Sequence, residues 1–128
     1  MRTLTQVSVI MLGTRNLERA VAFYHQKLGM RLNQQIPGLA FLNGGGVTLA
    51  LSEPLARARE TVAGATEVVF PVDNVKQAFG ELKSQGVEFV NEPRVVNGPM
   101  WAANFKDPDG HFLSIFGPEG GTAGGARE

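Results

Sequence analysis

The sequence contains no cysteine, carries no net charge and has no long hydrophobic run. The lack of cysteine excludes disulfides, thiolate metal sites and a cysteine nucleophile, and it leaves the redox compartment undetermined. Lysine and arginine together number 12, as do aspartate and glutamate. No net field therefore draws the chain to nucleic acid or to an anionic membrane, and we expect neither as a partner.

Targeting signals are lacking as well. Met1 to Gly13 has neither the long apolar core of a signal peptide nor its small-residue cleavage pattern. No apolar stretch approaches the ~20 residues that span a bilayer. A chain of 128 residues, 43% of them hydrophobic, can bury roughly two thirds of the surface that its unfolded form exposes. These features predict one soluble, cytoplasmic domain.

What the sequence does contain is an internal repeat. The segments that start at Val9 and at Glu67 both begin with an apolar run, pass a short polar break and enter a helix at an asparagine, Asn16 or Asn74. Each asparagine can cap its helix by accepting a hydrogen bond from a first-turn amide. Apolar residues then recur at helical spacing, in one helix at Leu17, Val21, Tyr24 and Leu28, and in the other at Val75, Phe79 and Leu82.

Each predicted helix ends at a glycine, and strands follow it. Gly29 and Gly86 can supply the left-handed residue that commonly ends a helix. We expect a strand at 30–34 and another at 87–91, each followed by a hairpin. The hairpin turns are the glycines 44–46 in the first copy and Asp107-Pro108-Asp109-Gly110 in the second. The sequence therefore predicts two strand-helix-strand-strand-strand modules.

The predicted boundaries follow from this repeat. Module one covers residues 5–52 and module two residues 66–117, within a single domain of residues 1–117. The segment 53–65 has no counterpart in the repeat and is expected to be a linker with room for one or two helical turns. The tail 118–128 is glycine-rich and has nothing to bury, so we expect it to be disordered.

A doubled unit of this kind, with Phe23-Tyr24 before Leu28-Gly29 and an Asp-Pro-Asp-Gly turn before the last strand, resembles the vicinal oxygen chelate superfamily. That superfamily includes glyoxalase I, bleomycin resistance proteins and extradiol dioxygenases. The resemblance covers about residues 5–117. It implies an α+β fold in which two tandem βαβββ modules form an open, curled mixed sheet, a cup with the helices on its convex side. It also implies a homodimer.

Strand alternation predicts which side chains point into such a cup, because successive residues of a strand face opposite sides. Val68, Phe70, Leu113 and Ile115 would face the helix. The segment around Met100 and Trp101 often borders the ligand in proteins that the chain resembles, and a role of these two residues in the core or in dimer contacts is equally open. The candidate ligand-binding residues, most of which are apolar, are Val9, Met11, Thr48, Ala50, Glu67, Met100, Trp101, Phe112 and Ser114.

The resemblance also indicates where metal ligands would stand. Metal-dependent members use histidine and glutamate at inward positions of four strands, and these positions fall on Val9, Ala50, Glu67 and Ser114. Three of the four carry no good ligand, and a catalytic metal normally needs three protein ligands. We therefore expect no cofactor and assign no metal ligands, although a divalent metal bound through atypical ligands stays open.

Other candidate motifs have structural explanations. His25 lies within the first predicted helix and is expected on its solvent side, and alternation aims His111 away from the cup. Asp107 and Asp109 lack the further acidic ligands of a calcium loop, so turn chemistry explains them. The three glycines at 44–46 precede no helix, which favours a hairpin turn over a phosphate cradle.

Glu67 is the candidate acid or base. A carboxylate that points into an apolar cup has a raised pKa if it is buried, and this would suit acid/base chemistry at neutral pH. A position near the strand end, solvation or an arginine partner would instead leave it structural. Both interpretations stay open at this point.

The sequence leaves three functions in competition. The first is a metal-independent protein that binds a small, partly apolar molecule in the cup. The second is a lyase, isomerase or dioxygenase of the glyoxalase kind that uses Glu67 as acid or base, or an atypical metal site. The third is a subunit or regulatory module whose cups serve only dimerisation. Whether the chain is an enzyme is undecided, because a fold does not fix a chemistry.

Overall fold

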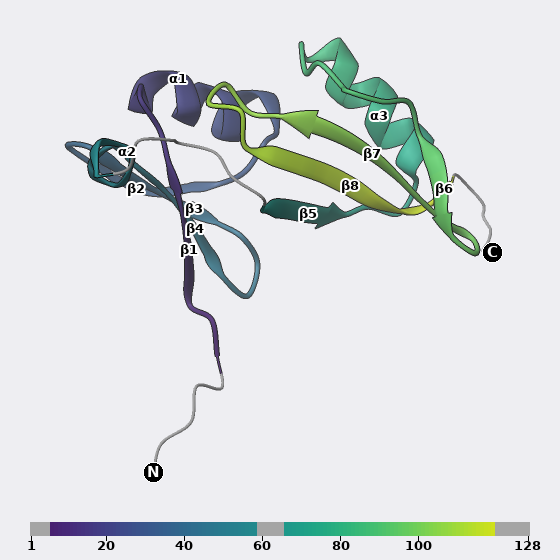
Figure 1. Cartoon of the computed structure of the whole chain (residues 1–128), viewed down its shortest axis with the longest axis horizontal. Helices are drawn as coiled ribbons and strands as arrows, with labels where there is room; N and C mark the ends of the chain where they lie inside the picture. The colour runs from purple at the N-terminus through teal and green to yellow at the C-terminus, as the bar shows by residue number, and fades with distance from the viewer. Residues whose placement is uncertain (1–5, 59–65, 120–128) are drawn as a thin grey trace. The chain divides into compact units, whose positions relative to one another are not determined.

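The computed structural model describes residues 6–58 and 66–119 and divides the chain into two compact units, split between Ala63 and Gly64 (Figure 1). Each unit has one four-stranded mixed sheet with a helix against it, so the α+β class and the two tandem βαβββ modules are confirmed. The first unit contains β1 (Val9–Gly13), α1 (Leu17–Val21), η1 (Ala22–Lys27), β2 (Leu32–Ile36), β3 (Leu39–Asn43), β4 (Thr48–Ser52) and α2 (Glu53–Arg57). The second contains β5 (Glu67–Pro71), α3 (Val75–Ser84), β6 (Arg94–Asn97), β7 (Met100–Lys106) and β8 (Phe112–Pro118).

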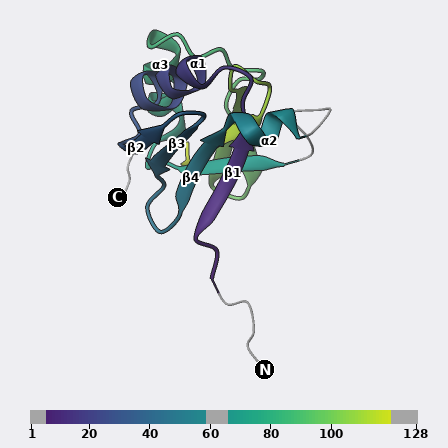
Figure 2. The same ribbon diagram turned by 90° about the vertical axis from the view of Figure 1, so that its left-hand side faces the viewer.

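In the first unit the strand order is β1-β4-β3-β2, with β1 parallel to β4 and the other neighbours antiparallel. Helix α1 packs on β3 and β4, and α2 lies against β1 (Figure 2). The centre of the face under α1 is apolar, and each side chain there is buried, as expected where a sheet and a helix share a core. These side chains are Ala40, Leu42, Leu49 and Leu51.

The second unit repeats this plan with the order β5-β8-β7-β6. Helix α3 packs on β7 and β8, above the buried Leu113 and Ile115. Three aromatic rings run from the helix to the sheet, with centroids 4.6 Å apart for Phe79 and Phe89 and 5.1 Å apart for Phe89 and Phe105. Of the predicted helix-facing residues, Leu113 and Ile115 belong to this core, whereas Val68 and Phe70 are half-buried.

The helix boundaries follow the predicted chemistry. The Asn16 Oδ1 accepts a hydrogen bond from the Arg19 amide at 3.0 Å, and the Asn74 Oδ1 accepts one from the Gln77 amide at 2.9 Å. Gly29 and Gly86 have φ values of 82° and 92°. This is the left-handed region that glycine enters without steric penalty, so both caps and both terminators are confirmed.

The first helix differs from the regular helix that the spacing predicted. After Val21 it continues as the π-helix η1, and the Leu28 amide donates to the Phe23 carbonyl, five residues back, at 3.0 Å. The wider turn shifts the apolar stripe, so that Phe23 and Tyr24 are both buried, with ring centroids 5.3 Å apart. An apolar stripe does not reveal whether an amide bonds to the carbonyl four or five residues back, which is why the pattern missed this turn.

Two predicted strands were misplaced. The strand expected at 30–34 is β2, two residues later. The one expected at 87–91 is not a strand, because only Phe89 forms an isolated bridge, to Phe105, and the edge strand is β6, Arg94–Asn97. Asn91 pairs through its side chain rather than along a ladder, and Pro93 has no amide to donate.

The segment between the modules begins with the short helix α2, which Ser52 caps by accepting a hydrogen bond from the Leu55 amide at 3.0 Å. The rest of the predicted linker, residues 59–65, and most of the predicted tail, residues 120–128, lie outside the described residues. Pro118, assigned to the tail, is the last residue of β8. Among the described residues, no helix has the length and apolar character required to cross a membrane.

Candidate functional site

The first unit places four predicted site residues on one sheet face. Val9 is registered with Thr48, and Met11 with Ala50, across the parallel pair β1 and β4. Residues registered with each other point to the same side, and this is the face opposite Leu49 and Leu51. Val9 and Met11 are 43% and 47% exposed. The four residues thus form an apolar patch with one hydroxyl group.

The second unit gathers most of the remaining candidates in the same way. Glu67 is registered with Phe112, and Ser114 is registered with both Val69 and Asn104. Met100 shares the face of Asn104 by strand alternation. We call this side, opposite Leu113 and Ile115, the inward face of the second unit; its residues are Glu67, Val69, Pro71, Arg94, Met100, Ala102, Asn104, Lys106, Phe112, Ser114 and Phe116.

Trp101 does not belong to that face. It is registered with Gly117, and the Lys76 ammonium of α3 lies 5.3 Å from its ring centroid. The side chain therefore stacks on the helix-covered side of the sheet as a cation–π partner. Trp101 is adjacent to Met100, and adjacent strand residues face opposite ways, so Trp101 does not share a sheet face with Glu67. Its part in ligand binding stays a prediction.

The residues present fit a divalent metal poorly. Of the four positions that the resemblance gives to metal ligands, only Glu67 carries a ligating side chain. Among residues 6–58 and 66–119 there is no group of three or more histidine, cysteine, aspartate or glutamate side chains that could hold a metal ion. One carboxylate beside a small hydroxyl does not supply the three protein ligands of a catalytic site.

Glu67 is exposed rather than desolvated, and its partner is an amide. The Glu67 Oε2 accepts a hydrogen bond from the Asn104 Nδ2 at 3.2 Å. Asn104 is in turn bonded to Asn91 and Arg94, whose Nδ2 and Nη1 atoms both lie 3.0 Å from its Oδ1. Ser114, where the family usually carries glutamate, lies on the strand between Glu67 and Asn104. Its small side chain leaves room for their bond.

The sequence reasoning missed this polar network, although a signal for it was present. The turn at 107–110 joins β7 to β8, and counting back from it pairs Asn104 with Ser114. Strand alternation would therefore have placed Asn104 on the inward face. Arg94 was hidden because the edge strand was expected at 87–91.

Neither histidine lies on an inward face. His25 is exposed, and its Nδ1 lies 2.7 Å from the Met30 carbonyl oxygen. His111 is buried, and its backbone amide donates to the Asp107 Oδ1 at 2.8 Å. The same oxygen accepts a hydrogen bond from the Asp109 amide at 2.9 Å, so the acidic turn is held by its own carboxylate. The turn chemistry expected of Asp107 and the solvent-side position expected of His25 are confirmed.

The glycines at 44–46 form the β3–β4 hairpin turn, as predicted. The Gly44 amide donates to the Val47 carbonyl at 2.8 Å, and Gly45 has a φ of 88°. A Cβ atom on Gly44 would lie 2.5 Å from that carbonyl oxygen. The turn is thus a close backbone approach, which glycine permits.

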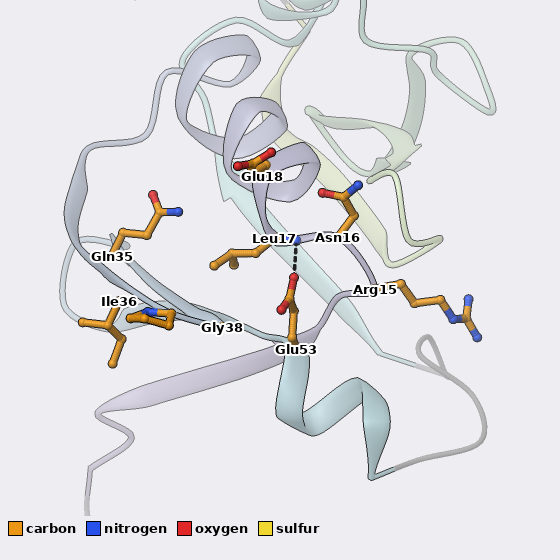
Figure 3. A pocket seen from close by; sticks show the side chains of 9 residues that line it. Arg15, Asn16, Leu17, Glu18, Gln35, Ile36, Gly38 and Glu53 are labelled. Atoms are coloured by element: carbon orange, nitrogen blue, oxygen red, sulfur yellow. Dashed lines mark hydrogen bonds between the residues drawn. The ribbon is translucent and has the colours of Figure 1, made fainter.

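A cleft of about 730 Å³ lies at the end of the first unit's sheet (Figure 3). Its walls are the start of α1, the β2–β3 turn and Glu53. The Glu53 Oε2 accepts a hydrogen bond from the Leu17 amide at 2.8 Å, so this carboxylate already occupies the first turn of the helix. No site residue predicted from the sequence lines the cleft, and its chemistry is that of a helix cap.

Comparison with known proteins shows which family has this fold. Residues 6–115 match the family model of the Glyoxalase/Bleomycin resistance protein/Dioxygenase superfamily. A glyoxalase/bleomycin resistance protein/dioxygenase from Nocardioides has 28% sequence identity and a TM-score of 0.78, over 98% of this chain and 91% of that one. No curated protein matches the chain.

Two further solved structures share the fold at lower identity. A lactoylglutathione lyase from Agrobacterium tumefaciens is 18% identical with a TM-score of 0.75, over 92% of this chain and 97% of that one. An antibiotic binding protein from Streptomyces is 21% identical with a TM-score of 0.75, over 92% and 99%. At such identities the likeness shows the fold alone, and this fold carries both an enzyme and a binding protein.

Proposed function

This chain belongs to the glyoxalase/bleomycin resistance protein/dioxygenase superfamily, and we propose that it binds a small, partly apolar molecule without the help of a metal ion. The observation that carries the proposal is the donor set. Val9, Ala50 and Ser114 stand where metal-dependent members have ligating side chains, and Glu67 alone remains.

The apolar character of the inward faces supports the same proposal. Val69, on the inward face of the second unit, is 51% exposed, and Phe112 and Phe116 beside it are half-buried. When a ligand covers exposed apolar side chains on a sheet face, their removal from water favours binding. Ligand sites are typically lined by such residues, with a few polar groups that fix orientation. The homodimer expected from the resemblance stays a prediction.

An enzyme is the second candidate, and one observation favours it. The hydrogen bond from Asn104 holds the Glu67 carboxylate in a defined place on the inward face. A general base must lie within hydrogen-bond reach of the proton it abstracts, and a positioned carboxylate meets the geometric part of that requirement. In that case Glu67 would act on a proton next to a substrate carbonyl.

The Glu67→Gln variant separates the two functions. For a binding protein, purely apolar ligands from a fragment library should bind the wild type and Glu67→Gln about equally well, with a chelator present throughout, because their burial does not need the charge. Calorimetry measures this binding, and assays with glyoxalase- and dioxygenase-type substrates measure turnover. If the wild type turns over one of these substrates and Glu67→Gln does not, the protein is an enzyme instead. Glu88→Gln, an exposed carboxylate that makes no bond to Asn104, is the matched control.

A further inference from the structure

Asn104 is a buried polar residue at the centre of the inward face of the second unit. It is 4% exposed. Its backbone amide donates to the Asn91 Oδ1 at 2.9 Å, and its carbonyl accepts from the Val90 amide at 2.8 Å. A buried polar side chain is costly unless its hydrogen bonds are made, so the surroundings of this carboxamide indicate what it does.

The orientation of the carboxamide is fixed by its partners. The Asn91 Nδ2 and the Arg94 Nη1 are both donors, and each lies 3.0 Å from the Asn104 Oδ1. A flipped amide would turn its own donor group towards these two donors, so only one orientation satisfies them. The Nδ2 atom must then face the opposite way, where it donates to the Glu67 Oε2 at 3.2 Å and to the Leu113 carbonyl oxygen at 3.4 Å.

The hydrogen bond from Asn104 fixes the orientation of the Glu67 carboxylate. A carboxylate has about four lone-pair positions, and the bond from Asn104 takes one of them. It ties the Oε2 atom to the sheet. The charged Arg94 on the far side of the amide strengthens that bond, because charge and neighbouring hydrogen bonds polarise one another. The rest of the exposed carboxylate can then face a ligand above Phe112, its neighbour in the register.

We propose that Asn104 is the positioning residue of this face. It holds the Glu67 carboxylate so that this group accepts a hydrogen bond from a hydroxyl or amine on an otherwise apolar ligand. The inference rests on the proposed binding function and narrows its ligand class. An aromatic molecule with one such donor satisfies both parts of the face, the ring against Phe112 and the donor against Glu67.

Two probes that differ only in the donor test the proposal: 2-naphthol, which has a hydroxyl, and 2-methoxynaphthalene, which does not. Dissociation constants are measured by calorimetry for the wild type, Glu67→Gln, Asn104→Ala and the double variant. We expect each single variant to weaken 2-naphthol binding about tenfold, which is about 1.4 kcal/mol. Binding of 2-methoxynaphthalene should change little, with Glu88→Gln as the control.

The double variant distinguishes positioning from general support of the fold. If Asn104 acts through Glu67, the double variant loses no more 2-naphthol affinity than either single variant, because both remove the same bond. Additive losses, or an Asn104→Ala variant that binds both probes equally poorly, would overturn the positioning role. A Glu67→Gln variant that binds 2-naphthol as the wild type does would also overturn it.

Failure of the proposed function has a different signature. If the wild type binds neither naphthalene and no member of an apolar fragment library, then the binding function fails and the inference fails with it. If the wild type binds both probes with the same affinity, the binding function is supported and the proposed role of Glu67 and Asn104 is contradicted.

The NMR resonances of the Asn104 side-chain amide test its bond to Glu67 without any ligand. They should shift in Glu67→Gln and stay in place in Glu88→Gln.

Discussion

Replacement of Phe105 by alanine is expected to lower the free energy of unfolding by about 3–5 kcal/mol. Phe105 is fully buried, and its ring contacts that of Phe89 under α3. Alanine removes this contact and leaves a cavity that the rigid sheet cannot close. Because domains are stable by only about 5–15 kcal/mol, the loss should be obvious in urea-induced unfolding.

Phe112→Ala is the matched control, because the same truncation is made on the opposite face of the neighbouring strand. Phe112 is half-buried and belongs to the inward face. Full burial of a phenylalanine is worth about 1.5–3 kcal/mol, so this variant should lose only about 1 kcal/mol of stability. It should also bind 2-naphthol more weakly. Equal losses of stability in the two variants would contradict the assignment of the faces.

Gly117→Ala is expected to destabilise the chain by about 3 kcal/mol, at the upper end of the range for overpacking. A Cβ atom at this position would lie 2.0 Å from the Val72 carbonyl oxygen, which is backbone and cannot rotate away. The Val72 amide donates to the Phe116 carbonyl at 2.9 Å. The clash would thus separate β5 from β8 and disturb the register that places Glu67 beside Phe112.

Gly80→Ala controls for the substitution itself. Gly80 lies within α3, and a Cβ atom there would meet nothing within 4 Å. Alanine should therefore raise the free energy of unfolding by roughly 0.5–1 kcal/mol, since glycine in a helix interior is unfavourable. Chemical denaturation should therefore show a lower free energy of unfolding for Gly117→Ala and a higher one for Gly80→Ala. A Gly117→Ala variant as stable as the wild type would show that β5 and β8 approach less closely.

Local chemistry made much of the fold predictable. The caps at Asn16 and Asn74 and the turn at Asp107 each depend on contacts within four residues, so sequence spacing carries them. The repeat then gave the module plan, because each copy supports the interpretation of the other. Alternation placed Leu113 and Ile115 on the face under α3 and Ser114 on the opposite face, although all three are buried.

Features that depend on distant partners were the ones missed. Asn104 meets Glu67, 37 positions away, and Asn91, 13 positions away. These pairs form only once the register of four strands is set, and a one-residue error in alternation moves a side chain to the other face. The π-helix was missed because a bond that spans five residues rather than four leaves no mark in the spacing of apolar residues.

The functional proposal depends on small side chains as much as on large ones. Ser114 is 2% exposed and lies between Glu67 and the amide that holds it. A glutamate there would bring a second carboxylate beside the first, and like charges at close range need a cation between them. With serine at this position, the Asn104 Nδ2 donates directly to the Glu67 Oε2 at 3.2 Å. This arrangement suits the hydrogen-bonding surface that we propose for a ligand.

The most direct test of metal-independent binding is the metal content of the untagged protein, purified without chelator and measured by elemental mass spectrometry. We expect nickel, zinc, manganese and iron to be far below one equivalent per chain, because the four positions that the resemblance gives to metal ligands offer one carboxylate and the described residues hold no group of three ligands. About one tightly held metal ion per chain would contradict the proposal and direct the search to metal-dependent chemistry.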